Sequence, residues 1–314
     1  MGQAIQSALN PAGLQAARIS ELYWLMFWTS TAVYVAVLVA LAMAIRRGRK
    51  ADAGKPARAT AAKSVIAATA VSILILVGLL FASVAAGRAV GSLPTEDALG
   101  IEVVGYQWWW SVKYNNPTPS LEVTTANELH VPIGRPIAIT LKAFDVIHSF
   151  WVPNLHGKVD LVPGRENRIT LQVDRAGVYR GQCAEYCGLQ HAHMAFSIIA
   201  EDSDAFERWL TAQRNPAPQP SSPEETSGLA VVERGPCQMC HTIRGTLAGG
   251  RVGPDLTHVA TRSTLAAGTI PNTRDWLTGW IKDPQHIKPG TRMPSTGLSE
   301  QELQALVAYL QTLK

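Results

Sequence analysis

Twelve residues near the middle of the chain, from Cys183 to Met194, place several metal-binding side chains close together. They read Cys183-Ala-Glu-Tyr-Cys187-Gly-Leu-Gln-His191-Ala-His-Met194. Two thiols, an imidazole and a thioether form a soft ligand set, which favours copper over magnesium or calcium. The spacing of Cys187, His191 and Met194 is that of a copper-binding loop at the end of a β-sandwich. The second thiol, on Cys183, can bridge to a second copper ion.

A pair of coppers needs another imidazole, and His148 in the segment 142–153 can supply it. Other interpretations exist for the same residues. A Cys-x3-Cys pair outside the cytoplasm can form a disulfide. Cysteine and histidine together can bind zinc, although methionine is a poor zinc ligand. A single His148 can be an interior, hydrogen-bonded side chain. Taken together, the side chains favour two copper ions, and we place His156 and His193 outside the ligand set.

The segment from Ile137 to Phe196 resembles the copper domain of subunit II of the haem–copper cytochrome c oxidases. This resemblance implies a dinuclear copper A centre, in which two cysteines bridge the copper ions and each of two histidines binds one ion. The implied ligands are His148, Cys183, Glu185 through its backbone carbonyl, Cys187, His191 and Met194.

The same resemblance implies two further roles. The Glu185 side chain would help hold a magnesium ion at the junction with subunit I, and the alternative is a plain surface carboxylate. The run Tyr106-Gln-Trp108-Trp109-Trp110 matches an aromatic cluster of the family, and Trp108 aligns with the tryptophan at which electrons enter the copper pair. The family usually has His where this chain has Tyr106. Three adjacent tryptophans on one strand would alternate between its faces, so at least one would lie outside the core.

A second cofactor motif, Cys237-Gln-Met-Cys240-His241, lies further along the chain. In an exported segment, Cys-x-x-Cys-His is the attachment site of c-type haem, with both thiols bound to the haem and His241 as an axial iron ligand. Without the histidine, the two cysteines would indicate a redox disulfide. Met293 is the only methionine after the motif, and we expect it to be the second axial ligand. Its rivals are His258 and His286.

The residues after this motif resemble a class I cytochrome c. The run 299–310 has leucine and valine at helical spacing, with a serine cap and acidic residues in its first turn. Axial coordination by histidine and methionine gives a haem the potential of an electron carrier. A haem with both axial positions filled binds no substrate, so we expect this one to pass electrons.

Two apolar stretches precede these motifs. Residues 22–45 and 64–87 each comprise 24 residues without a charge. As helices they would be roughly 36 Å long, enough to cross a bilayer. The loop 46–63 between them has seven basic residues and one acidic residue, which favours the cytoplasmic side. The formal net charge of +4 lies largely in this loop and does not indicate nucleic-acid binding.

The sequence therefore predicts a multidomain chain. Residues 1–97 would hold an N-terminal tail and a two-helix transmembrane hairpin, with helices at about 22–45 and 64–87. From Leu99, short alternating strands separated by Pro and Gly predict an all-β, cupredoxin-like Greek-key sandwich, the copper domain, over 98–210. A Pro-rich linker would span 211–228, and an all-α class I cytochrome c domain, the haem domain, would span 229–314. Residues 1–17 lack the basic and apolar regions of a cleavable signal peptide, so either the chain lacks one or the first membrane helix directs export.

As a whole, the chain resembles subunit II of a caa-type cytochrome c oxidase. The resemblance implies that electrons from a cytochrome c or a cytochrome bc complex pass through haem c and copper A to subunit I. That partner would reduce oxygen and pump protons, and subunit III would complete the complex. The expected location is a bacterial inner membrane, with the N-terminus, copper domain and haem domain on the outer side. No carboxylate lies near Lys63, where some relatives have a glutamate at a proton entrance.

Other classes of protein fit the chain less well. A dinuclear-copper subunit of a nitric-oxide reductase would use similar ligands, and this alternative stays open from the sequence. Subunit II of a quinol oxidase lacks the metal ligands that are present here. A scaffolding membrane protein would need neither a copper loop nor a haem motif. We find no nucleotide-binding loop and no Ser/His/Asp arrangement, so the expected role is that of an electron-transfer subunit.

Overall fold

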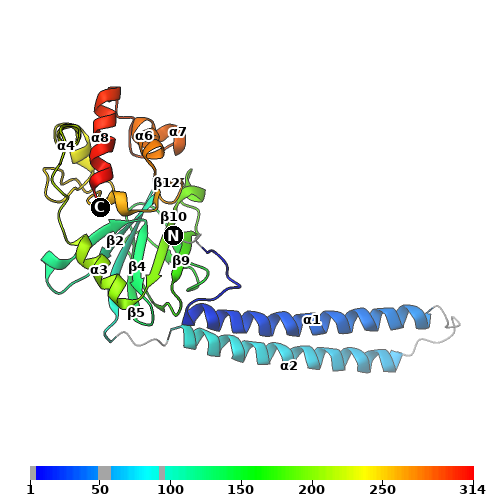
Figure 1. Cartoon of the computed structure of the whole chain (residues 1–314). Coiled ribbons are helices and arrows are strands. Elements are labelled where there is room, and N and C mark those ends of the chain that lie inside the picture. The colour runs from blue at the N-terminus through cyan, green and yellow to red at the C-terminus, as the bar shows by residue number, and fades with distance from the viewer. Residues whose placement is uncertain (1–4, 49–57, 92–95) are drawn as a thin grey trace. The chain divides into compact units, whose positions relative to one another are not determined.

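The computed structural model describes residues 5–48, 58–91 and 96–314, without the side chains of 58–61. Residues 17–92 form one compact unit, and residues 1–16 together with 93–314 form a second. The first unit consists of helices α1 (Leu14–Gly48) and α2 (Arg58–Val90), which run side by side (Figure 1). Both helices extend beyond the predicted spans at each end. By length and composition, both are candidates for crossing a membrane.

The predicted sandwich is present in the second unit. The strand order of one sheet is β3-β2-β1-β5-β8, and that of the other is β4-β10-β9-β6-β7. The first sheet contains β1 (Leu99–Tyr106), β2 (Trp109–Tyr114), β3 (Val123–Ala126), β5 (Pro136–Ala143) and β8 (Asn167–Gln172). The second contains β4 (Glu128–Pro132), β6 (His148–Trp151), β7 (Val159–Leu161), β9 (Gly177–Cys183) and β10 (Ala195–Glu201).

The core of the sandwich follows from the alternation that the sequence shows. In β1, buried and partly exposed residues alternate along the strand. Ile101 and Val103 are fully buried and pair with Ile139 and Leu141 of the parallel neighbour β5. Because successive strand side chains point to opposite faces, one face of each sheet supplies the apolar interior. The resulting framework holds the strand ends that carry the metal ligands.

Residues 5–13 are added to this sandwich, which the sequence did not indicate. The backbone amide of Ile5 donates to the carbonyl of Val178 at 2.8 Å, and Ala12 donates to Asn154 at 2.8 Å. The segment therefore extends the copper domain by a stretch of chain that precedes α1. It carries no periodic apolar pattern, so local sequence signals give no reason to expect the pairing.

Two helices flank the segment that we expect to be a linker. Helix α3 (Ser203–Gln213) ends at Gln213 and α4 (Pro223–Arg234) begins at Pro223, so residues 214–222 lie between them. Side chains from the haem domain hold this segment. His258 Nε2 donates to the carbonyl of Asn215 at 3.1 Å, and the Arg244 guanidinium donates to the carbonyls of Gln213 and Arg214.

The haem domain is helical, as predicted, and Figure 1 shows α4, α6, α7 and α8 grouped apart from the strands. Its elements after α4 include α5 (Cys237–Cys240), α6 (Arg274–Lys282), α7 (Pro284–Ile287), α8 (Glu300–Thr312) and a short pair of strands, β11 (Thr264–Leu265) and β12 (Ile270–Pro271). Ser299 and Glu302 form a capping box at the start of α8, in agreement with the serine cap and acidic first turn of the sequence. Helix α4 packs directly on α8.

Candidate copper centre and haem site

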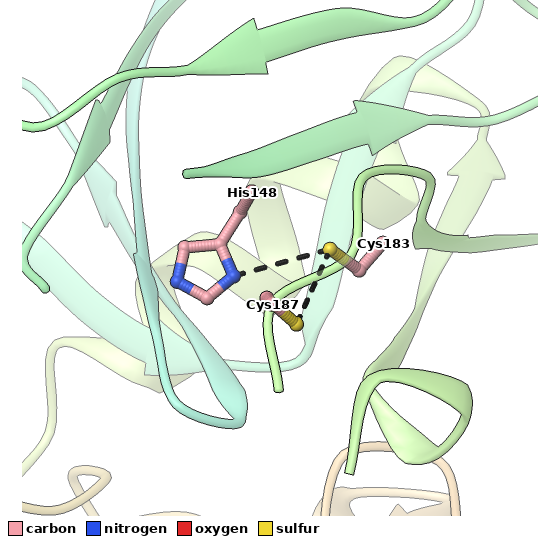
Figure 2. A group of neighbouring side chains, drawn as sticks. All are labelled: His148, Cys183 and Cys187. Atoms are coloured by element: carbon pink, nitrogen blue, oxygen red, sulfur yellow. Dashed lines mark hydrogen bonds between the residues drawn. The ribbon is translucent and has the colours of Figure 1, made fainter. Parts of the chain in front are cut away.

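Two strand ends of one sheet bring the predicted copper ligands together. His148 begins β6 and Cys183 ends β9, and these two strands are paired. Figure 2 shows His148, Cys183 and Cys187 converging on one point. The Nδ1 atom of His148 lies 3.9 Å from Cys183 Sγ, and the two Sγ atoms are 3.7 Å apart. All three side chains are buried.

The loop after β9 supplies the rest of the predicted set. Cys187 Sγ lies 3.5 Å from His191 Nδ1 and 3.8 Å from Met194 Sδ. The carbonyl oxygen of Glu185 lies 3.2 Å from Cys183 Sγ. The six predicted ligand residues therefore form one cluster, with the two sulfur atoms at its centre. Thiolate, imidazole and thioether donors in this arrangement fit copper.

Asp145 orients His148 from outside this cluster. Its Oδ1 atom accepts a hydrogen bond from His148 Nε2 at 3.0 Å, which leaves Nδ1 facing the cysteines. Backbone amides of Gln107 and Val146 hold the same carboxylate, each at 2.8 Å. Burial alone would raise the pKa of Asp145, but these hydrogen bonds lower it below the usual value. A carboxylate behind a metal-binding imidazole fixes the ring and increases its basicity.

The two buried thiols influence each other strongly. The neighbouring Cys187 thiol lowers the pKa of Cys183 to about 3, and the same closeness raises the pKa of Cys187. One proton thus leaves the pair easily, while the second is held. Because a thiol must be deprotonated to bind a metal, metal binding has to displace that second proton.

Trp108 contacts the cluster, although not from a strand. It lies between β1 and β2, so the expectation of three tryptophans along one strand is wrong. Its indole Nε1–H donates to the carbonyl of Cys187 at 3.0 Å, and its side chain is only 9% exposed. Trp109 and Trp110 do alternate along β2: Trp110 is in the core, and Trp109 stacks on Tyr106 at 4.6 Å.

The haem-motif residues line one cavity, which Trp108 and Trp109 of the copper domain also border. Cys237, Cys240, His241 and Met293 all border it, with apolar neighbours such as Leu277. His241 Nδ1 donates to the carbonyl of Pro254 at 2.8 Å, which leaves Nε2 for an iron atom. Burial lowers the pKa of His241, so its imidazole is neutral, as a metal ligand requires. An apolar cavity with two thiols and these axial candidates fits a covalently bound haem.

The rivals of Met293 are placed differently. Both ring nitrogens of His258 contact backbone carbonyls, of Lys314 at 3.0 Å and of Asn215 at 3.1 Å. His286 is exposed. Neither histidine borders the cavity, whereas Met293 does, and this supports Met293 as the second axial ligand.

One predicted site residue and three residues that were not predicted remain to be placed around the copper centre. The Glu185 side chain, proposed for magnesium, is exposed. Gln107, Asp145 and Lys288 make contacts around the site that the sequence analysis missed. Asp145 lies three residues before His148, a spacing that offered a local signal. Lys288 reaches Trp108, 180 positions away, and no local pattern indicates that contact.

Comparisons with known proteins match both regions of the chain that hold these sites. Residues 117–201 match the family model described as cytochrome c oxidase subunit II, periplasmic domain, and residues 227–314 match the cytochrome c model. Cytochrome c oxidase subunit 2 of Alkalihalophilus pseudofirmus is 33% identical over 324 residues, which covers 100% of this chain and 92% of that relative. The Bacillus subtilis protein of the same name is 34% identical over 70% of this chain, and the match spans 63% of that protein.

A solved structure shows a similar but partial match. The periplasmic domain of subunit II of the Bradyrhizobium japonicum cytochrome oxidase is 30% identical, with a TM-score of 0.35, and the match covers 37% of this chain and 93% of that chain. The assignment therefore rests on the sequence matches, which extend over both cofactor regions. The chain belongs to the cytochrome c oxidase subunit II family and carries a cytochrome c domain at its C-terminal end.

Proposed function

We propose that this subunit accepts electrons on a haem c bound to Cys237 and Cys240 and passes them through a dinuclear copper A centre. From there they would reach the haem–copper site of subunit I, where oxygen is reduced to water with proton pumping. The observation that carries the proposal is the cluster of six ligand residues around two cysteine sulfurs 3.7 Å apart. Family membership makes the chain an electron-transfer component of a respiratory oxidase.

The protein residues around the cluster suit electron transfer. When bound, a copper pair supplies a one-electron carrier. The strand ends at His148 and Cys183 belong to a packed sandwich, and Asp145 restrains the imidazole from behind. Ligands held in this way move little when the charge of a metal changes, which keeps the cost of each transfer low.

Trp108 is the proposed entry point for electrons. It borders the same cavity as Cys240 and Met293, and its indole hydrogen-bonds the carbonyl of the ligand residue Cys187. One side chain thus contacts both proposed cofactor sites. The reducing haem would lie on one side of the ring and the copper ligands on the other.

The remaining placements complete the proposal. The chain is membrane-anchored, with the copper region matching a periplasmic domain. We place the loop 46–63 on the cytoplasmic side because of its basic residues, although 49–57 lie outside the described residues. We further propose that the chain assembles with subunits I and III and receives electrons from a cytochrome c or a cytochrome bc complex. Glu185 would help to bind magnesium. Metal analysis of the assembled complex and protease access to the loop in sealed vesicles would test these placements.

Trp108→Ala tests the entry role. In stopped-flow reduction of the chain, we expect haem reduction to be unchanged and copper reduction to be slowed by about tenfold, equivalent to about 1.4 kcal/mol of barrier. Trp209→Ala is the matched control, because Trp209 stacks on His130 in the copper domain and does not border this cavity. Equal copper rates in Trp108→Ala and the unmodified chain would rule out the entry role.

The nitric-oxide reductase alternative gains no support from the family matches or the relatives.

A further inference from the structure

A buried lysine joins the haem domain to the copper domain. Lys288 is only 2% exposed. Its ammonium donates to the carbonyl of Trp108 at 2.9 Å, of His193 at 2.6 Å and of Ala266 at 2.8 Å. Two of these acceptors belong to the copper domain and the third to the haem domain. An ammonium has three donors, and all three are used here.

We propose that Lys288 is the positioning residue that seats the haem domain on Trp108. This inference rests on the proposed function, because it concerns the step from haem to copper. Lys288 would hold the two proposed cofactor sites together. It also makes the haem domain a docked donor, held by specific hydrogen bonds as well as by the linker.

The residues after Lys288 continue the contact. The side-chain amide of Gln190, from the copper-ligand loop, donates to the carbonyl of Pro289 at 2.8 Å. A Cβ atom on Gly290 would lie 3.2 Å from Leu189 and 3.6 Å from the Trp108 ring, so the bare backbone packs on the indole. Gly290 also has a φ of 84°, which favours glycine. The segment 288–293 thus begins on Trp108 and ends at Met293, the proposed axial ligand.

Other contacts between the domains help to align them. The amide of Ala195 donates to the carbonyl of Ala267 at 2.9 Å, and the amide of Ser263 donates to the Glu128 carboxylate at 2.8 Å. Arg292 pairs with Asp145 at 3.3 Å, but its side chain is 54% exposed. Exposed ion pairs contribute little, so Arg292 cannot replace a buried anchor.

Burial makes Lys288 sensitive to substitution. Removal from water lowers its pKa to about 7, and the three carbonyl oxygens offset this cost by accepting hydrogen bonds from the ammonium. Lys288→Met has a similar volume but no donors. The buried carbonyl of Trp108 would lose its partner, and the carbonyls of His193 and Ala266 would share the one remaining donor, the Thr269 hydroxyl. Unpaired buried polar groups are costly, and the carbonyls of Trp108 and His193 belong to the copper domain. Separation of the two domains would return these two carbonyls to water.

The test compares Lys288→Met with the unmodified full-length chain carrying copper and haem. We expect electron transfer from haem to copper to slow by on the order of tenfold or more. Backbone hydrogen exchange of the interdomain amides of Ala195 and Ser263 should become faster. Exchange of the Leu303 amide, which donates to the carbonyl of Ser299 at the N-cap of α8, should not change. The haem and copper spectra should also stay the same.

Two further variants sharpen the test. Lys282→Met is the matched control, because Lys282 is exposed in α6 of the same domain, and it should leave rate and exchange unchanged. Lys288→Arg keeps the charge, so it should restore part of the electron-transfer rate and part of the protection of the interdomain amides from exchange. Unchanged transfer and exchange in Lys288→Met would overturn the proposal. Faster exchange at Leu303 would also overturn it, because the lysine would then support the haem domain itself. If the unmodified chain fails to transfer electrons, the proposed function fails, while the exchange result still decides the role of Lys288 in docking.

Discussion

At the scale of single residues, the imidazole of His148 is oriented by a side chain outside the ligand set. Asp145 receives its Nε2–H at 3.0 Å and is itself held by two backbone amides. The ring is therefore fixed before any metal arrives, with Nδ1 directed at Cys183. The sequence was sufficient to propose the ligands, because five of the six lie within twelve residues in a characteristic spacing. It did not identify Asp145, whose role depends on the geometry of the turn before β6.

Asp145→Ala removes this support. We expect copper affinity to fall by about 10- to 100-fold, since the imidazole loses its orientation and the carboxylate that makes it more basic. Competition against a copper chelator measures the change. Asp145→Asn keeps an acceptor without the charge, so its copper affinity should lie between that of the unmodified chain and that of Asp145→Ala. Asp160→Asn serves as the control, because Asp160 is an exposed residue of β7. Equal affinity in Asp145→Ala and the unmodified chain would show that His148 needs no such support.

At the scale of elements, the fold places ligands at strand ends and the haem motif beside helix contacts. The alternating strands and the capped C-terminal helix were predictable because their signals are local. Two features were not: the pairing of residues 5–13 with the sandwich, and the position of Trp108 in a turn. Both depend on partners far along the chain. The packing of α4 on α8 was also not predictable, because it requires a glycine at the point where the two helices approach each other most closely.

Gly228 is that point. A Cβ atom there would clash with the carbonyl oxygen of Ala305 in α8. We expect Gly228→Ala to destabilise the haem domain by about 1–3 kcal/mol, the usual cost of overpacking. Chemical denaturation followed by haem absorption would measure it. The control is Ser227→Ala, an exposed neighbour on α4. If both variants unfold at the same denaturant concentration, the helices do not approach as closely as described.

At the scale of the whole molecule, the chain joins a membrane hairpin, a copper-binding sandwich and a haem domain in one polypeptide. The order of these parts was predictable from composition and motifs, and the family matches agree with it. The contact between haem domain and copper domain was not, because Lys288 and its acceptors share no local pattern. A covalent connection keeps the local concentration of donor high, and specific contacts such as those of Lys288 add orientation.

The most direct test of this account is the metal and haem content of the purified full-length chain, combined with electron paramagnetic resonance. The account predicts two copper ions that share one unpaired electron, together with one covalently attached low-spin haem per chain. Zinc in place of copper, a single copper ion, or a disulfide between Cys183 and Cys187 in the protein as isolated would contradict it.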